Sequence, residues 1–189
     1  MKDINLSPML DIDLVLVPTD FSESAARALA HARELAVTHG ARLDLLHVVE
    51  EAAFPSIYGA GAAALSENVP ALEDRAKASL DRLASELGAE GVEHGFGCHV
   101  KQGVAAAEVV RFAEDHDVDL IVMGSHGQSA LERVLVGSVA DRVIRTALCP
   151  IFLVQTFGKS LLPTPESEGP SASEDRGPEG GSERSESGA

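Results

Sequence analysis

The sequence predicts an α/β fold of three layers, with a five-stranded, mostly parallel open sheet between two layers of helices. Strand-like and helix-like patterns alternate from residue 11 to residue 157, which is typical of right-handed β–α–β crossovers. Three short runs are apolar throughout, namely LVLV, LIVM and IFLV, as expected of strands covered on both faces. Hydrophobic residues make up 44% of the chain, which is enough for a packed core around such a sheet.

The first half of this domain contains two strands and two helices. A strand is predicted at residues 11–17, where Pro18 ends it, and Ser22 is placed to cap a helix that reaches about Gly40. A second strand follows at residues 42–49. Residues 50–69 have no firm pattern, and a connection of this length is usually a lid, a partner surface or disordered. The next helix has a clear apolar stripe, made of Leu72, Ala76, Leu80, Leu83 and Leu87.

The second half repeats the alternation. Its predicted elements are a weak strand at 95–100, a helix at 105–115, an apolar strand at 119–123, a helix through Ala147 and a final strand at 150–155. In open parallel sheets of this kind, ligands bind beyond the carboxyl ends of the strands, where the strand order reverses. Polar and glycine-rich segments at the strand ends are therefore the candidates for a site.

The composition divides the chain into three parts. Residues 1–10 form an N-terminal extension, and residues 11–157 form the predicted domain. From residue 158 to residue 189 the chain is crowded with Ser, Glu, Gly and Pro and has almost no apolar residues after Leu162. Such a segment cannot bury enough surface to offset the entropy lost on ordering. We therefore expect a disordered acidic tail.

The charge and the cysteine content exclude several classes of protein. The net charge is −15, and such a surface repels nucleic acids. Residues 1–10 do not resemble a secretory signal, and no apolar run is long enough to span a membrane. The two cysteines, Cys98 and Cys149, cannot form a disulfide framework and lack metal-site spacing. We expect a soluble, cytoplasmic protein with no membrane or nucleic-acid partner and no bound structural metal.

A glycine pattern follows the strand at 119–123. Gly124 and Gly127 are followed, after nine residues, by Gly137-Ser138. Gly124 and Gly127 are expected to let the backbone turn sharply and approach a ligand. Ser138 and Asp141 have the spacing of a capping box, so Ser138 is expected to begin a helix whose free N–H groups favour an anion. The pattern thus predicts a phosphate cradle, although a capped helix beside a tight turn, with no ligand, has the same pattern.

Two other strand ends meet the same edge of the sheet. The first strand ends in Pro18-Thr19-Asp20, and an acidic residue at this place commonly binds ribose hydroxyls. A carboxylate that only begins the helix near Ser22 is the alternative. The second strand ends in His47-Val48-Val49, whose backbone could pair with the edge of an adenine. No nucleophile, base and orienting group recur at a recognisable spacing, so no catalytic residue is predicted.

At these residues the sequence resembles the universal stress protein family. The segment LVPTDFSESAARALAHA is similar to the opening strand and helix of that family. The segment VMGSHGQSALERVLVGSVADRVIRTALCPIFLV matches its signature, G-x2-G-x9-G-[S/T]. The resemblance extends roughly from residue 13 to residue 154. It implies the strand order 3-2-1-4-5, a homodimer joined through the final strand, Ile151–Val154, and a bound ATP with Mg²⁺, because the glycine signature is complete.

The resemblance also implies a role for each site residue. Asp20 would contact the ribose, Val48 would hold adenine through its backbone, and Pro18 and Thr19 would line the pocket for base and ribose. The remaining residues would lie against the nucleotide or receive its phosphates: Met123, Gly124, Gly127, Gly137, Ser138 and Val139.

The function predicted on these grounds is an ATP-binding regulatory protein of the stress response, with little or no turnover. Two other functions remain open. One is an interaction module without a nucleotide that acts through its dimer and its tail. The other is a slow ATP hydrolase or an autophosphorylating protein.

Overall fold

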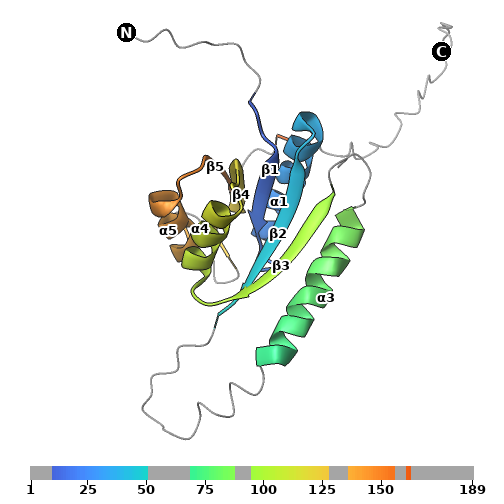
Figure 1. Ribbon diagram of the computed structural model, residues 1–189, viewed down its shortest axis with the longest axis vertical. Coiled ribbons are helices and arrows are strands. Elements are labelled where there is room, and N and C mark those ends of the chain that lie inside the picture. The colour runs from blue at the N-terminus through green and yellow to red at the C-terminus, as the bar shows by residue number, and fades with distance from the viewer. Residues whose placement is uncertain (1–9, 51–68, 88–94, 128–135, 156–160, 163–189) are drawn as a thin grey trace, which may run out of the picture.

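A computed structural model of the chain describes residues 10–50, 69–87, 95–127, 136–155 and 161–162. Five parallel strands form one sheet in the order β3-β2-β1-β4-β5 (Figure 1). The elements are β1 Leu14–Pro18, α1 Glu23–His39, β2 Arg42–Val49, α3 Val69–Leu87, β3 Phe96–Gln102, α4 Ala105–Asp115, β4 Leu120–Gly124, α5 Ser138–Thr146 and β5 Ile151–Val154. This arrangement confirms the predicted fold class and strand order.

The helices form one layer on each face of the sheet. On one face, α1 and α3 pack against alternate strand residues that include Val15, Leu43 and Val122. On the other face, α4 and α5 pack against Leu16, Leu46 and Ile121. Because successive side chains of a strand point to opposite faces, one apolar run supplies both cores. No helix of the described ranges is long and apolar enough to cross a membrane.

The switch in strand order lies between β1 and β4. The chain passes from β1 outward through β2 to β3, and then returns to place β4 on the other side of β1. The connections that leave the carboxyl ends of β1 and β4 therefore turn to opposite faces of the sheet. A crevice opens at such a point in doubly wound folds. The predicted site residues lie at this edge.

The helix ends agree with the sequence at α1 and differ at α5. Ser22 caps α1, because its Oγ accepts the N–H of Ala25 at 3.2 Å. In α5 the N-cap is Gly137 rather than Ser138, and no side chain caps the helix. The expected capping box is therefore wrong. The carboxylate of Asp141 instead binds Arg145 one turn later, at 3.0 and 3.1 Å, and this hydrogen bond lowers the pKa of Asp141.

The apolar stripe of α3 is only partly buried. Ala76 and Leu80 lie in the core, whereas Leu72 is 44% exposed. Leu72 lies near the start of the helix, where it lines the cavity described below rather than a strand. The third strand begins and ends later than expected, at Phe96 and Gln102. Most of the unpatterned segment 50–69 and most of the predicted tail lie outside the described residues.

The described part of the predicted tail, residues 161–162, contacts helix α1. The backbone N–H of Leu161 donates to Nε2 of His31 on α1 at 3.4 Å, while the side chain of Leu161 is 73% exposed. A hydrogen bond of this length between neutral groups contributes less than about 1 kcal/mol.

Truncation after Phe157 is therefore expected to change the melting temperature by no more than about 2 °C. Differential scanning calorimetry of the full chain and of the two truncations, after Phe157 and after Leu162, tests this. A fall of more than about 5 °C in the shorter truncation alone would make residues 161–162 part of the domain.

Candidate functional site

A cavity of about 690 Å³ lies at the carboxyl ends of β1, β2 and β4. Its walls come from these strand ends, from the first three turns of α3, from α4 and from the start of α5. Every residue that the sequence predicted for the site lines this cavity: Pro18, Thr19, Asp20, Val48, Met123, Gly124, Gly127, Gly137, Ser138 and Val139. The fold thus brings all ten together. The role of each toward a ligand stays a prediction.

The carboxylate of Asp20 lies directly against Gly127. Oδ1 of Asp20 accepts the N–H of Ser22 at 3.0 Å, which holds the carboxylate at the start of α1. A Cβ on Gly127 would lie 2.6 Å from Oδ2 of the same carboxylate. Gly127 therefore lacks a side chain because the carboxylate of Asp20 occupies that space. The two groups form one wall of the cavity, between the β1 and β4 ends.

The structure shows a packing reason for the glycine at position 124. A Cβ on Gly124 would lie 2.3 Å from Oγ of Ser24 and 3.0 Å from its backbone carbonyl carbon. The glycine therefore permits close packing of β4 on α1, while its approach to a ligand stays a prediction. Neither Gly124 nor Gly127 has a positive φ, so the expected sharp turn does not depend on left-handed backbone at either position.

The first turn of α5 presents free N–H groups. The N–H of Gly137 donates to the carbonyl of Ser125 at 2.8 Å, and the first helical bond runs from Asp141 to Gly137 at 2.9 Å. The N–H groups of Ser138, Val139 and Ala140 therefore have no partner within the helix. All three residues line the cavity. Together with the positive end of the helix dipole, these donors favour an anionic group.

The backbone of Val48 opens toward the same space. The carbonyl of Leu46 accepts the N–H of Thr19 at 2.9 Å on the β1 side, whereas that of Val49 accepts the N–H of Gly103 at 3.1 Å on the β3 side. Backbone groups alternate along a strand, so the N–H and C=O of Val48 point toward β1. Since β1 ends at Pro18, opposite Leu46, the Val48 groups lie beyond its end and can pair with a flat heterocycle.

His47 and Phe21 were not predicted as site residues. Nδ1 of His47 lies 2.8 Å from the carbonyl oxygen of Thr19. The ring of Phe21 lies against that of His47, with centroids 4.6 Å apart. Both rings line the cavity next to Val48. The sequence signal was weak, because an aromatic residue after Asp20 and a histidine in a buried strand both resemble ordinary packing residues.

Charged groups of both signs surround the cavity. Asp20, Glu50 and Arg75 line it, and Glu50 ties β2 to α4 by accepting the N–H of Ala105 at 2.9 Å. Arg75 makes no ion pair within the described part of the chain. The position of Arg75 was also missed, because the sequence shows that α3 has an apolar stripe but not how the helix is rotated against the sheet.

His126 lies between the glycines of the motif. Its Nδ1 is 2.8 Å from Oγ of the buried Ser125. Its Nε2 is buried and has no hydrogen-bond partner among the described residues. A buried polar atom without a partner calls for an explanation, such as a group that the structure does not contain. At the border of a cavity lined by free N–H donors, a bound ligand is a suitable explanation.

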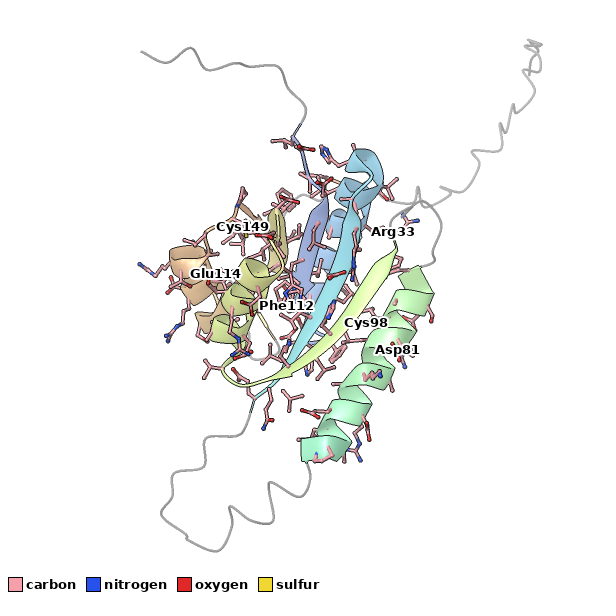
Figure 2. The ribbon with its side chains drawn as sticks, in the orientation of Figure 1. Arg33, Asp81, Cys98, Phe112, Glu114 and Cys149 are labelled. Carbon is pink, nitrogen blue, oxygen red and sulfur yellow. The ribbon has the colours of Figure 1, made fainter. Side chains whose placement is uncertain are left out.

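The cysteines lie apart from this site. Burial raises the pKa of Cys98, with smaller contributions from the carboxylates of Asp81 and Asp44. Figure 2 shows Cys98 on β3, and Asp81 on α3, which packs beside that strand. Burial likewise raises the pKa of Cys149. Both thiols are therefore protonated near neutral pH and are poor nucleophiles. Within the described ranges no three His, Cys, Asp or Glu side chains group as metal ligands.

Comparison with known proteins identifies the family that this chain resembles. The model of the Universal stress protein family matches residues 12–155. The universal stress protein MJ0531 of Methanocaldococcus jannaschii is 35% identical over 142 residues, which cover 75% of this chain and 81% of that protein. Among solved structures, the universal stress protein UspA from Lactobacillus plantarum has a TM-score of 0.69 at 28% identity, covering 77% of this chain and 99% of that one. A universal stress protein solved in complex with cAMP has a TM-score of 0.56 at 25% identity, covering 78% of this chain and 100% of that one.

Proposed function

The chain belongs to the universal stress protein family, and from that premise we propose that it is a regulatory protein that binds ATP and turns it over slowly or not at all. One observation carries the proposal. A single cavity joins three groups: the backbone edge of Val48, the carboxylate of Asp20 and the N–H groups at the start of α5, and no described residue pairs with these backbone groups. These are the partners that a base, a ribose and a phosphate chain require, in that order along the ligand.

The groups that would bind the base, the ribose and the phosphates belong to different segments of the chain. The backbone of Val48 would pair with the base, beyond the end of β1. Asp20, next along the edge, would accept hydrogen bonds from ribose hydroxyls. Ser138 and Val139 would donate their N–H groups to phosphate oxygens, and the exposed hydroxyl of Ser138 would add a further donor. The cAMP complex of a relative shows that a protein of this family can hold an adenine nucleotide.

Mg²⁺ would enter with the nucleotide rather than occupy a site of its own. This cation usually keeps several waters and is held by one or two carboxylates together with the phosphates of a substrate. Asp20, whose carboxylate lies against Gly127 of the cradle, is the residue placed to contribute. The ion would offset the charge that a triphosphate adds to a chain of net charge −15.

The direct test starts from the purified full-length protein. Denaturation followed by chromatography of the released small molecules identifies a ligand carried through purification. Isothermal titration calorimetry of the emptied protein with MgATP, AMP and adenosine then measures the contribution of each part of the nucleotide. We expect ATP to bind most tightly. Absence of binding by ATP in the micromolar to millimolar range would contradict the proposal.

Slow turnover follows from the kind of donor that the cradle offers. Backbone N–H groups bind the ground state and the transition state similarly, and uniform binding does not accelerate a reaction. Fast phosphoryl transfer usually needs Lys, Arg and metal aligned on the γ-phosphate. We expect ATP to be recovered intact after incubation with the protein and Mg²⁺ for minutes. Recovery of ADP or of phosphorylated protein would favour the slow hydrolase or the autophosphorylating protein instead.

The outer edge of β5, which no described strand covers, supports a homodimer. Pro150 and Val154 use their carbonyls to bind β4, accepting the N–H groups of Ile121 and Ser125 at 3.0 and 2.8 Å. By alternation, the N–H and C=O groups of Ile151 and Leu153 point away from β4. An apolar edge strand with unpaired backbone groups invites pairing with another strand. A second copy of β5 would satisfy these groups. An interaction module without a nucleotide, the alternative function, would use the same edge strand.

Replacing Leu153 with proline is expected to give monomers. Proline removes an outward N–H but none of the bonds to β4, so the sheet itself can stay intact. Light scattering coupled to size-exclusion chromatography measures the mass, and circular dichroism checks the fold. The matched control is Leu153→Ala, which keeps the N–H and should remain dimeric. A parent protein that is already monomeric at micromolar concentration would overturn the dimer.

A further inference from the structure

We infer that His47 determines the base specificity of the site by accepting a hydrogen bond from an exocyclic amine, as in adenine. The inference rests on the proposed nucleotide function and assigns a role to a side chain that the sequence did not single out. His47 directly precedes Val48, whose free backbone edge would pair with the base, and its ring lines the same cavity. The two adjacent residues would therefore read one base together.

The hydrogen bond to Thr19 determines which nitrogen of His47 accepts. Nδ1 lies 2.8 Å from the carbonyl oxygen of Thr19. A carbonyl oxygen only accepts, so Nδ1 must carry the hydrogen. In the neutral imidazole the other nitrogen, Nε2, then has a lone pair and no hydrogen. Nε2 is thus an acceptor, and within the described residues it has no hydrogen-bond partner.

The orientation of the ring is held from two sides. Thr19 binds Nδ1, and the ring of Phe21 lies over the imidazole with centroids 4.6 Å apart. Phe21 has a φ of 62°, a backbone conformation that non-glycine residues rarely adopt and that costs of order 1 kcal/mol or more. Its N–H donates to Oγ1 of Thr19 at 3.1 Å, which helps to hold this conformation. The backbone conformation that brings the ring of Phe21 against His47 is therefore held by this hydrogen bond.

A fixed acceptor discriminates between an amine and a carbonyl. The 6-amino group of adenine can donate to Nε2. Hypoxanthine, the base of inosine triphosphate (ITP), has a carbonyl oxygen at that position and would place two acceptors against each other. Sites with a fixed polar group reject the ligand that leaves that group unpaired. ATP and ITP share the ribose and the triphosphate, so their comparison isolates the base.

Isothermal titration calorimetry of the full-length protein with MgATP and MgITP tests the inference. We expect the parent to bind ATP about tenfold or more tightly than ITP, as the loss of one hydrogen bond and an unpaired acceptor predict. The amide of Gln reaches the position of Nε2, whereas that of Asn reaches the position of Nδ1. His47→Gln should therefore keep most of the preference, and His47→Asn should reduce the ratio of the two dissociation constants several-fold, to the part that the backbone of Val48 contributes.

The outcomes separate the possible roles of His47. If the residue only ties β2 to Thr19, then His47→Asn keeps the preference and His47→Gln weakens ATP and ITP equally, which overturns the inference. Equal binding of ATP and ITP by the parent also overturns it, while leaving the proposed function intact. Failure of the parent to bind either nucleotide refutes the proposed function and the inference with it.

Discussion

Gly127→Val is expected to weaken nucleotide binding strongly while the domain remains folded. Any Cβ at this position meets Oδ2 of Asp20 at 2.6 Å, so the carboxylate must leave the place where it would meet the ribose or Mg²⁺. The two methyl groups of valine would then project into the cavity. Loss of two charge-assisted hydrogen bonds at roughly 1.5 kcal/mol each corresponds to about a 100-fold weaker affinity. Titration calorimetry with MgATP measures the loss.

A smaller side chain serves as the graded control. Gly127→Ala adds the Cβ but no further methyl groups, and the carboxylate of Asp20 can rotate away from it. We expect about a tenfold loss for alanine, between the parent and the valine variant. Calorimetric melting of all three proteins checks that the fold is kept. If both variants bind ATP like the parent, then the phosphates and the ribose do not lie beside Gly127.

The fold and the strand order could be predicted because they depend on local patterns. Runs such as LIVM are buried on both faces in the structure, and Ser22 caps α1 as its spacing predicts. The site could be located for a related reason. Parallel strands end at one edge of the sheet, so Asp20, Val48 and Gly124 had to meet there once the strands were recognised.

Contacts between distant segments could not be predicted. The sequence shows a glycine at position 124 but not that Ser24 of α1 lies against it, so ligand approach and helix packing were indistinguishable. The N-cap of α5 was misplaced by one residue because Asp141 can bind either back toward the N-cap or forward to Arg145. The tautomer of His47 depends on a carbonyl in another strand.

Asp44 is a further residue whose environment the sequence does not reveal. It lies on β2 and is 2% exposed, within a run that was expected to be a buried strand. Its carboxylate accepts from Nε of Arg42 at 2.7 Å and pairs with Nε2 of His99 at 3.0 Å. Gly97 of β3 faces it without a side chain, since a Cβ there would lie 2.3 Å from Oδ1. The ring of His99 packs on Phe112 of α4, labelled in Figure 2.

Asp44→Ala is expected to lower the free energy of unfolding by about 3 kcal/mol. Breaking a buried ion pair costs roughly 3–5 kcal/mol because the remaining partner loses its counter-charge. The lower end applies here, since Arg42 is half-exposed and can be hydrated. For a domain of this size the melting temperature should fall by roughly 10 °C. Urea unfolding followed by circular dichroism measures the loss.

The matched control for Asp44 is Asp115→Ala, which removes an exposed carboxylate at the end of α4 and should change the stability by less than about 0.5 kcal/mol. Asp44→Asn keeps the size of the side chain and one acceptor oxygen, so it should fall between the parent and the alanine variant. If the alanine variant unfolds at the same urea concentration as the parent, then Asp44 does not stabilise the sheet. Asp44 lies on β2, the strand that carries His47 and Val48. Removal of its carboxylate is therefore also expected to weaken ATP binding, but only near the unfolding transition. Well below that transition, the affinity of the alanine variant should equal that of the parent, which separates a residue that stabilises the sheet from one that contacts the nucleotide.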